Sequence, residues 1–153
     1  MPGSGTPNAL KRLIASSLIY IVLAVIAGTI AVSRNFPAQP LGEGSGTGRP
    51  VLQEFVFGNG TAMSPGLPWL AMQAVLTLVA SRKGRWSVVG VIGLAIFGLL
   101  SGVFATTEPM ARQIFTPGTF EPLLALIEAG VILTPFAMLA FAILEWIRRR
   151  KGA

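Results

Sequence analysis

The sequence predicts an all-α integral membrane protein, a four-transmembrane-helix bundle with both termini cytoplasmic, one long outer loop and one short outer loop. Hydrophobic residues make up 52% of the 153 residues and charged residues only 12%, about half the charged fraction of an ordinary soluble domain. The apolar residues form long runs, and most basic residues lie in short clusters beside those runs. This pattern is typical of a single membrane domain, which we place over residues 1–153.

The first predicted span covers residues 13–32, twenty uncharged residues that are long enough to cross about 30 Å of hydrocarbon. Thr6 and Pro7 predict the start of its helix, because Thr is a common N-cap and Pro suits the first turn. A cleaved signal peptide is the alternative, since residues 31–33 resemble a small-x-small cleavage site. The apolar part of a signal peptide has only about 7–15 residues, so the length favours an uncleaved span.

The long outer loop is predicted over residues 33–64. Residues 41–50 have the glycine-rich composition of a flexible linker. Residues 51–57 are aromatic and β-branched, and they predict either a short strand that enters a turn or a segment that lies on the bilayer surface. Residues 59–61, Asn-Gly-Thr, fit the N-glycosylation pattern, but the Asn-Gly pair favours a plain turn.

Three further spans are predicted over residues 65–81, 87–106 and 120–147. Ser64 and Pro65 predict the opening of the second span, whose length of about 17 residues is at the lower limit for crossing a bilayer. The short outer loop, residues 107–119, contains a predicted short helix at residues 109–115 that lies along the membrane interface.

The orientation follows from the distribution of the twelve Lys and Arg residues. One side of the four spans carries nine of them: Lys11, Arg12, Arg82, Lys83, Arg85, Arg148, Arg149, Arg150 and Lys151. The other side carries Arg34, Arg49 and Arg112. Loops rich in Lys and Arg stay in the cytoplasm, so both termini are predicted inside and the protein is predicted to be integral to the cell membrane.

Small residues predict where the helices approach one another closely. Gly98 and Gly102 share one side of the third span, and Ala24 and Gly28 share one side of the first. Such faces let a neighbouring backbone come near. The two faces can meet each other inside one bundle, which we favour, or they can form a homodimer.

Glu128 is the one acidic residue deep in an apolar run. Eighteen residues separate it from Trp146 at the inner boundary, which is about 27 Å along a helix and roughly 25 Å after tilt. Glu128 is therefore predicted near the outer edge of the hydrocarbon, where it can reach water or an arginine. Arg34 and Arg112 are the candidate partners on that side.

A functional interpretation of Glu128 joins it with three other residues in a candidate intramembrane polar site: Gln73, Thr134 and Pro135. Pro135 removes a backbone hydrogen bond and frees the carbonyl of Val131, and Thr134 can fill that gap. A carboxylate, an amide and a freed carbonyl can form a small cavity for a proton or a cation. The simpler alternatives are an interhelical hydrogen bond for Gln73 and a tolerated kink at Pro135.

The residue inventory argues against catalysis. The chain has no Cys, no His and no Asp, so it contains no thiolate, no Ser-His-Asp triad and no common zinc site. No catalytic residue, cofactor or metal is predicted, an enzyme is disfavoured, and the charge placement argues against a nucleic-acid partner.

The leading expectation is therefore a small non-catalytic structural, accessory or partner-binding membrane component. Its expected partners are the lipid bilayer and, as a homodimer or complex subunit, other membrane proteins. The alternative is a small proton- or cation-coupled carrier that uses Glu128. Glu145 is expected to form an ordinary ion pair with Arg148 and Arg149, which follow it by three and four residues.

Overall fold

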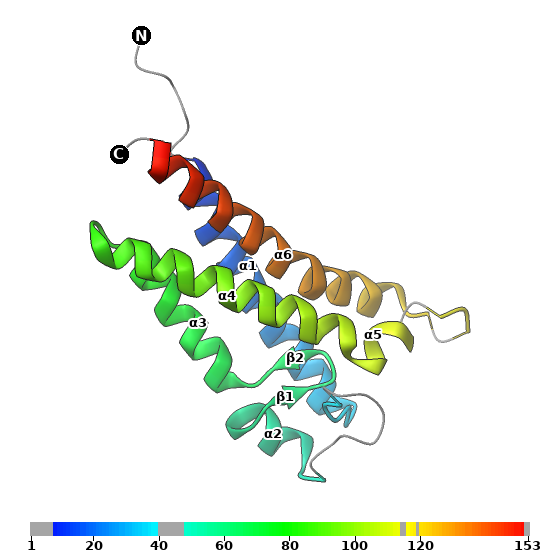
Figure 1. The fold of residues 1–153 in the computed structure, drawn as a ribbon. Helices are drawn as coiled ribbons and strands as arrows, with labels where there is room; N and C mark the ends of the chain where they lie inside the picture. Colours follow the sequence, from blue (N-terminus) through cyan, green and yellow to red (C-terminus); the bar gives the residue numbers. More distant parts are fainter. Residues whose placement is uncertain (1–7, 40–47, 114–115, 119, 152–153) are drawn as a thin grey trace.

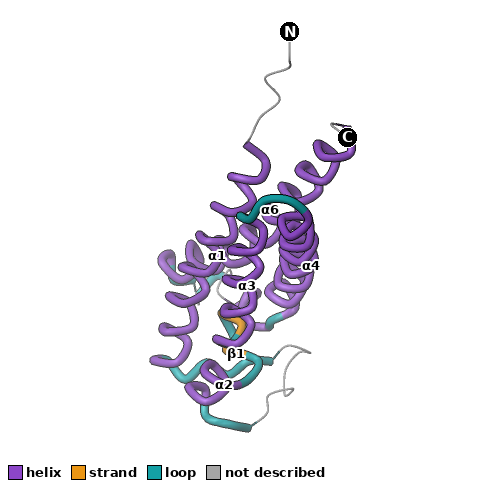
Figure 2. The backbone as a smooth tube through the Cα atoms, turned by 90° about the vertical axis from the view of Figure 1, so that its left-hand side faces the viewer, coloured by secondary structure: helices purple, strands orange, loops and turns teal. Residues whose placement is uncertain are grey.

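The computed structural model describes residues 8–39, 48–113, 116–118 and 120–151. The described chain is helical apart from one small hairpin. In order, its elements are α1 (Asn8–Ser33), α2 (Val51–Phe57), β1 (Gly60–Thr61), β2 (Ser64–Pro65), α3 (Leu67–Ala80), α4 (Arg85–Thr107), α5 (Pro109–Gln113) and α6 (Pro122–Lys151). The long helices α1 and α4 both lie alongside α6, and α3 lies beside α1 and α4 (Figures 1 and 2).

Three helices are long and apolar enough to cross a membrane: α1, α4 and α6. Their outward surfaces carry many exposed Leu, Ile, Val and Phe side chains, as expected of helices that face lipid. The predicted bounds hold within a few residues, except that α6 continues through the basic residues to Lys151. Positive charge in the last turn of a helix interacts favourably with its dipole, which explains this extension.

The second predicted span is a shorter helix than expected. Helix α3 has 14 residues, which is about 21 Å of helix and less than a typical hydrocarbon core. The prediction that Ser64 and Pro65 open this helix is wrong, because they form β2 and pair with β1. The helix begins only after Gly66, whose extended backbone makes it the N-cap.

A compact cap lies between α1 and α3 and consists of α2 and the hairpin. The strand interpretation of residues 51–57 is wrong, since this segment is helical; it buries Val51, Glu54 and Phe55, an i, i+3, i+4 face. The predicted turn lies slightly later than expected: Gly60 and Thr61 form β1, and the hairpin turns at residues 62–63. Gly60 has a φ of +118°, which only glycine adopts without strain, and it pairs with Pro65 in the hairpin.

The small-residue faces pack inside the bundle but not against each other. A Cβ on Gly98 would stand 2.6 Å from the carbonyl oxygen of Pro135 in α6, and a Cβ on Gly102 would meet the Phe136 ring. Gly28 of α1 instead lies under the ring of Phe55 in the cap, while Ala24 is fully buried. The prediction that the two faces meet each other is therefore wrong: the α4 face packs against α6, and Gly28 of the α1 face packs against the cap.

The two ends of the bundle differ in chemistry. The start of α1, the turn between α3 and α4 and the end of α6 lie at one end, whereas α2, the hairpin and α5 lie at the other (Figure 1). The Arg12 guanidinium lies 6.0 Å from the centre of the Phe141 ring, which joins α1 to α6 at the basic end. Several predicted features lie outside the described residues: the cap at residues 6–7, most of the linker at 41–50, and residues 114–115 of the short helix.

Candidate functional site

A cavity of about 270 Å³ lies at the capped end of the bundle. Its walls come from α1, α3, α4, α6 and the hairpin, and they are largely apolar, with rings from Trp69, Phe97 and Phe104. Two carboxyl groups face the same space, those of Glu108 and Glu128. Among the described residues that line it, none is Lys or Arg.

Glu128 is on the buried face of α6 and is only 1% exposed. It lies one helical turn from Leu124, Ala125 and Val131, which are also buried. Within the described part of the chain, its Oε2 atom has no hydrogen-bond partner. A buried carboxylate without a cationic partner is strongly destabilising, so this group requires a bound proton, a bound cation or water.

The expected arginine partner of Glu128 is bound elsewhere. The Arg34 guanidinium donates to both carboxylate oxygens of Glu121, at 2.7 and 2.8 Å, so the prediction that Arg34 pairs with Glu128 is wrong. This hydrogen bond holds the pKa of Glu121 below its ordinary value. The side chain of Arg112, the other predicted partner, lies outside the described part of the chain.

Glu108 is the second acidic group of the cavity and follows directly after α4. Its carboxylate accepts two hydrogen bonds from the backbone N–H of Gln39, at 3.1 and 3.2 Å. Burial raises the pKa of Glu108 to about 7, and the Gln39 N–H opposes that shift. Glu108 can therefore gain or lose a proton near neutral pH.

Uncharged polar side chains complete the polar part of the cavity lining: Tyr20, Ser101, and Asn59, Thr61 and Ser64 at the hairpin. Tyr20 of α1 is fully buried, and it lines the cavity together with Ser101 of α4. Sequence reasoning did not select Tyr20, Ser101 or Glu108. Tyr20 is the sole tyrosine of the chain and stands inside an apolar run, which is a signal that could have identified it.

Gln73 belongs to a different polar cluster, between α1 and α3. Its Nε2 donates to the Ser17 hydroxyl at 2.9 Å, and the Ser17 and Thr77 hydroxyls lie 2.7 Å apart. The interhelical hydrogen bond proposed as the simpler role of Gln73 is thus confirmed. Glu128 lines the cavity and Gln73 does not, so the structure does not bring the two together.

Thr134 and Pro135 also lie away from the cavity lining. The Thr134 hydroxyl donates to the carbonyl of Gly130 at 2.6 Å, not to the carbonyl of Val131 that Pro135 leaves free. Helix α6 continues through Pro135, whose own carbonyl faces Gly98. The four residues of the predicted polar site are thus divided, and Glu128 alone borders the empty volume.

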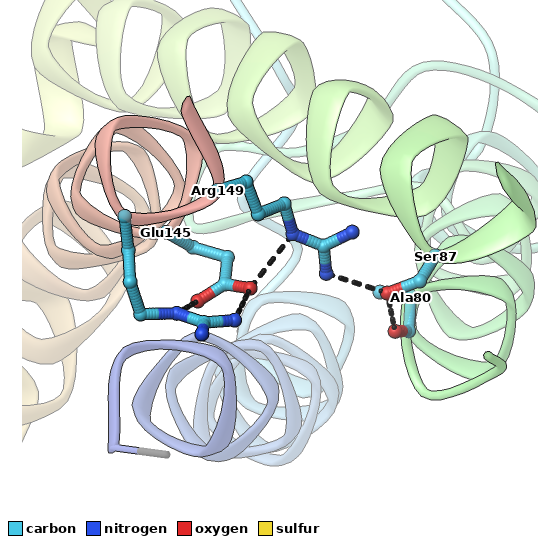
Figure 3. A network of polar contacts seen from close by, with 5 residues as sticks. Ala80, Ser87, Glu145 and Arg149 are labelled. Carbon is cyan, nitrogen blue, oxygen red and sulfur yellow. Dashed lines mark hydrogen bonds and ion pairs between the residues drawn. The ribbon is translucent and has the colours of Figure 1, made fainter. Parts of the chain in front are cut away.

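A network of charges lies at the opposite end of the bundle (Figure 3). Glu145 is 0% exposed and accepts hydrogen bonds from Arg148 at 2.6 and 2.8 Å and from Arg149 at 2.7 Å, so its predicted ion pairs are confirmed. Arg149 also donates to the Ser87 hydroxyl, which donates to the carbonyl of Ala80. The network therefore fixes the end of α6 to the turn between α3 and α4.

The cavity has a limited chemical repertoire. In the described residues, no group of three or more His, Cys, Asp or Glu side chains is placed to hold a metal ion. The cavity is lined by two carboxyl groups, four hydroxyl groups, one amide and aromatic walls. These groups can exchange a proton or bind a cation, and they can hold an apolar molecule beside it.

Comparisons with known proteins give no relative for this chain. No family model, no curated protein and no solved structure matches it. The functional proposals below therefore depend on the residues, the charges and the cavity already described.

Proposed function

We propose that the chain is a four-span protein of the cell membrane with both termini in the cytoplasm. The clustering of Lys11, Arg12 and residues 82–85 and 148–151 at one end of the bundle supports this orientation (Figure 1). In addition to the three long helices, α3 serves as a fourth, shorter span, which is second in chain order. Its exposed Met72, Val75 and Leu78 form a stripe suited to lipid.

Helix α1 acts in this proposal as a retained span and not as a cleaved signal. Its buried face includes Leu13, Tyr20 and Ala27, which belong to the apolar core shared with α6. Tyr20 also forms part of the cavity wall. Removing this helix would open the core and the cavity together, so the packing supports a lasting role in the bundle.

The function that we propose is non-catalytic: the protein binds and carries a proton or a small cation at Glu128. The observation that supports it is the Glu128 carboxyl group, which is buried beside a cavity, has an unpartnered oxygen and has no Lys or Arg among its described neighbours in the cavity wall. A carboxyl kept only for packing would be replaced by an apolar residue at a gain in stability. Its presence at a cavity supports a ligand-exchanging role.

The test is proton exchange by the purified protein in lipid bilayers. Infrared difference spectra recorded between pH 5 and pH 9 should contain a carboxyl band that Glu128→Gln removes. Liposomes that contain a trapped pH dye and the wild-type protein should dissipate an imposed pH gradient faster than empty liposomes. Glu121→Gln is the matched control, because Glu121 is an exposed, arginine-paired carboxylate just before the same helix. Wild-type spectra identical to those of Glu128→Gln would remove the basis of the proposal.

A second candidate function is the accessory or partner-binding role expected from the sequence. It is favoured by the cap, where Phe57 is 79% exposed and Leu52 is also exposed. Such side chains suit a protein partner or the membrane surface. Phe57→Ser should disrupt complex formation under this idea and leave proton exchange at Glu128 unchanged, so the two functions are separable.

A further inference from the structure

The charges around the cavity have one sign. Three titratable side chains line the cavity: Glu128 from α6, Glu108 from the end of α4 and Tyr20 from α1. Tyrosine is neutral over the physiological pH range. The described lining residues of α3 and the hairpin contain no ionisable group. Glu121 and Arg34 lie nearby in the sequence but neutralise each other. The field inside the cavity is therefore negative whenever either carboxyl group is ionised.

The walls of the cavity select against a bare or hydrated metal ion. Metal sites require several oxygen ligands, and no such group of acidic side chains occurs in residues 8–39, 48–113, 116–118 and 120–151. The walls are instead aromatic and aliphatic. Trp69 and Phe97 both line the cavity, with their ring centres 5.9 Å apart and their planes tilted by 59° to each other. Aromatic faces attract organic cations and also bind apolar groups.

The size of the cavity sets the size of the ligand. A volume of about 270 Å³ is close to the lower end of small-molecule sites, which begin at about 300 Å³. It suits a molecule with a single ring or a short chain and is too roomy for a proton alone. The unpartnered oxygen of Glu128 gives the positive group of such a ligand a place to bind.

We propose that the natural ligand of this cavity is a small amphiphilic organic cation, an amine or quaternary ammonium group on an apolar body of about one ring. The positive group contacts Glu128, with Glu108 as the second anion, and the apolar body lies against Trp69, Phe97 and Phe104. This inference rests on the proposed function and names the class of molecule that the site takes. The step is a proton transfer without redox chemistry: the carboxyl O–H bond breaks, water accepts the proton, and the cation pairs with the carboxylate that remains.

The competition between proton and cation predicts a pH dependence. Both compete for the same carboxylates, so binding should tighten as pH rises. The Glu108 carboxyl, whose burial raises its pKa to about 7, places part of this change between pH 6 and pH 8. Binding should also release protons, and the number released should fall in Glu128→Gln.

The experiment is calorimetric titration of the full chain in lipid nanodiscs with benzyltrimethylammonium and with neopentylbenzene, its uncharged carbon isostere. We expect the ammonium compound to bind and the isostere to bind at least about tenfold more weakly, since charge-assisted contacts have this magnitude. Glu128→Gln should lose at least about tenfold in affinity, Glu128→Asp should retain part of it, and Glu121→Gln should match the wild type.

The outcomes separate this inference from the proposed function. Equal binding of the ammonium compound and its isostere would overturn the cation assignment and indicate an apolar ligand site. Absence of binding by benzyltrimethylammonium and by tetramethylammonium up to 10 mM would also overturn it, while the infrared and pH-gradient results would still support proton exchange. Wild-type infrared spectra identical to those of Glu128→Gln, together with equal affinities of the wild type and a well-folded Glu128→Gln for benzyltrimethylammonium, would overturn both.

Discussion

The contact between Gly98 and Pro135 offers a direct test of how closely α4 and α6 pack. In Gly98→Ala, the new Cβ would stand 2.6 Å from the carbonyl oxygen of Pro135 and 3.3 Å from the backbone nitrogen of Leu139. A carbon and a carbonyl oxygen in favourable contact stand about 3.3 Å apart, so the helices must separate by about 0.7 Å, the difference of the two distances. Backbone atoms of a continuous helix cannot rotate away as a side chain can.

The expected loss can be worked out from two opposing terms. Overpacking at a tight contact costs about 1–3 kcal/mol, and the upper half of that range applies because the obstacle is backbone. Replacing glycine by alanine inside a helix stabilises the helix by about 1 kcal/mol. The net effect of Gly98→Ala is therefore a loss of about 1–2 kcal/mol in the free energy of unfolding.

Gly93→Ala is the matched control on the same helix. Its new Cβ would stand 2.5 Å from the Cδ2 atom of Leu76, the end of a flexible side chain that can turn aside. We expect this variant to be unchanged or up to about 1 kcal/mol more stable. Unfolding by sodium dodecyl sulfate in mixed micelles, followed by circular dichroism, measures both. A Gly98→Ala protein as stable as Gly93→Ala would refute the close approach of α4 and α6.

Three further predictions concern the charged groups. Glu145→Ala should lower the unfolding free energy by about 1–3 kcal/mol in the same assay, because two arginines lose the buried carboxylate that binds them. Arg34→Ala should leave the unfolding free energy nearly unchanged, since its pair with Glu121 is exposed and screened by water. Glu108 is protonated more readily in the folded protein, so its stabilisation is complete below about pH 4.5 and is lost as pH rises through about 7. Unfolding measured from pH 4 to pH 8 should show this decline in the wild type and a flatter profile in Glu108→Gln.

The long helices could be predicted from the sequence because their signal is local. Twenty uncharged residues have few alternatives to a helix in a membrane, and α1, α4 and α6 begin and end near the predicted limits. The short helix at residues 109–113 was also predicted from local composition. In each case the composition of the helix itself is enough to predict that it forms.

The cap could not be predicted in the same way. Residues 51–57 have strand-like composition but form a helix, because a buried face of Val51, Glu54 and Phe55 packs beneath α1 and Phe55 covers Gly28. Ser64 and Pro65 pair with β1 and so delay the start of α3. The first result depends on a tertiary contact with the distant helix α1, which overrides local propensity, and the second depends on a hairpin pairing between neighbouring residues that composition alone does not reveal.

The same distinction applies to Glu128. Its depth near one end of the bundle followed from counting residues, and the cavity does lie at the capped end. The neighbours of Glu128 could not be predicted from the sequence. The predicted topology puts both Glu121 and Glu128 on the same side of the membrane as Arg34, and nothing in the sequence shows which of the two glutamates Arg34 binds. In the structure, Arg34 forms its ion pair with the exposed Glu121. Glu108, at the end of α4, lines the same cavity as Glu128.

Glu128 lacks a basic partner because of where the basic residues lie, and not because the chain has too few of them. The chain has twelve Lys and Arg residues for six acidic ones. At the basic end, Glu145 receives two arginines; at the capped end, the described residues offer Glu128 none. The same helix α6 thus carries one buried carboxylate that is fully satisfied and one that is not. A buried acid that serves only to hold helices together resembles Glu145, with its charge neutralised within the protein. Glu128 lacks that neutralisation and borders an empty volume, which is the arrangement required of a group whose counter-charge arrives from outside the protein.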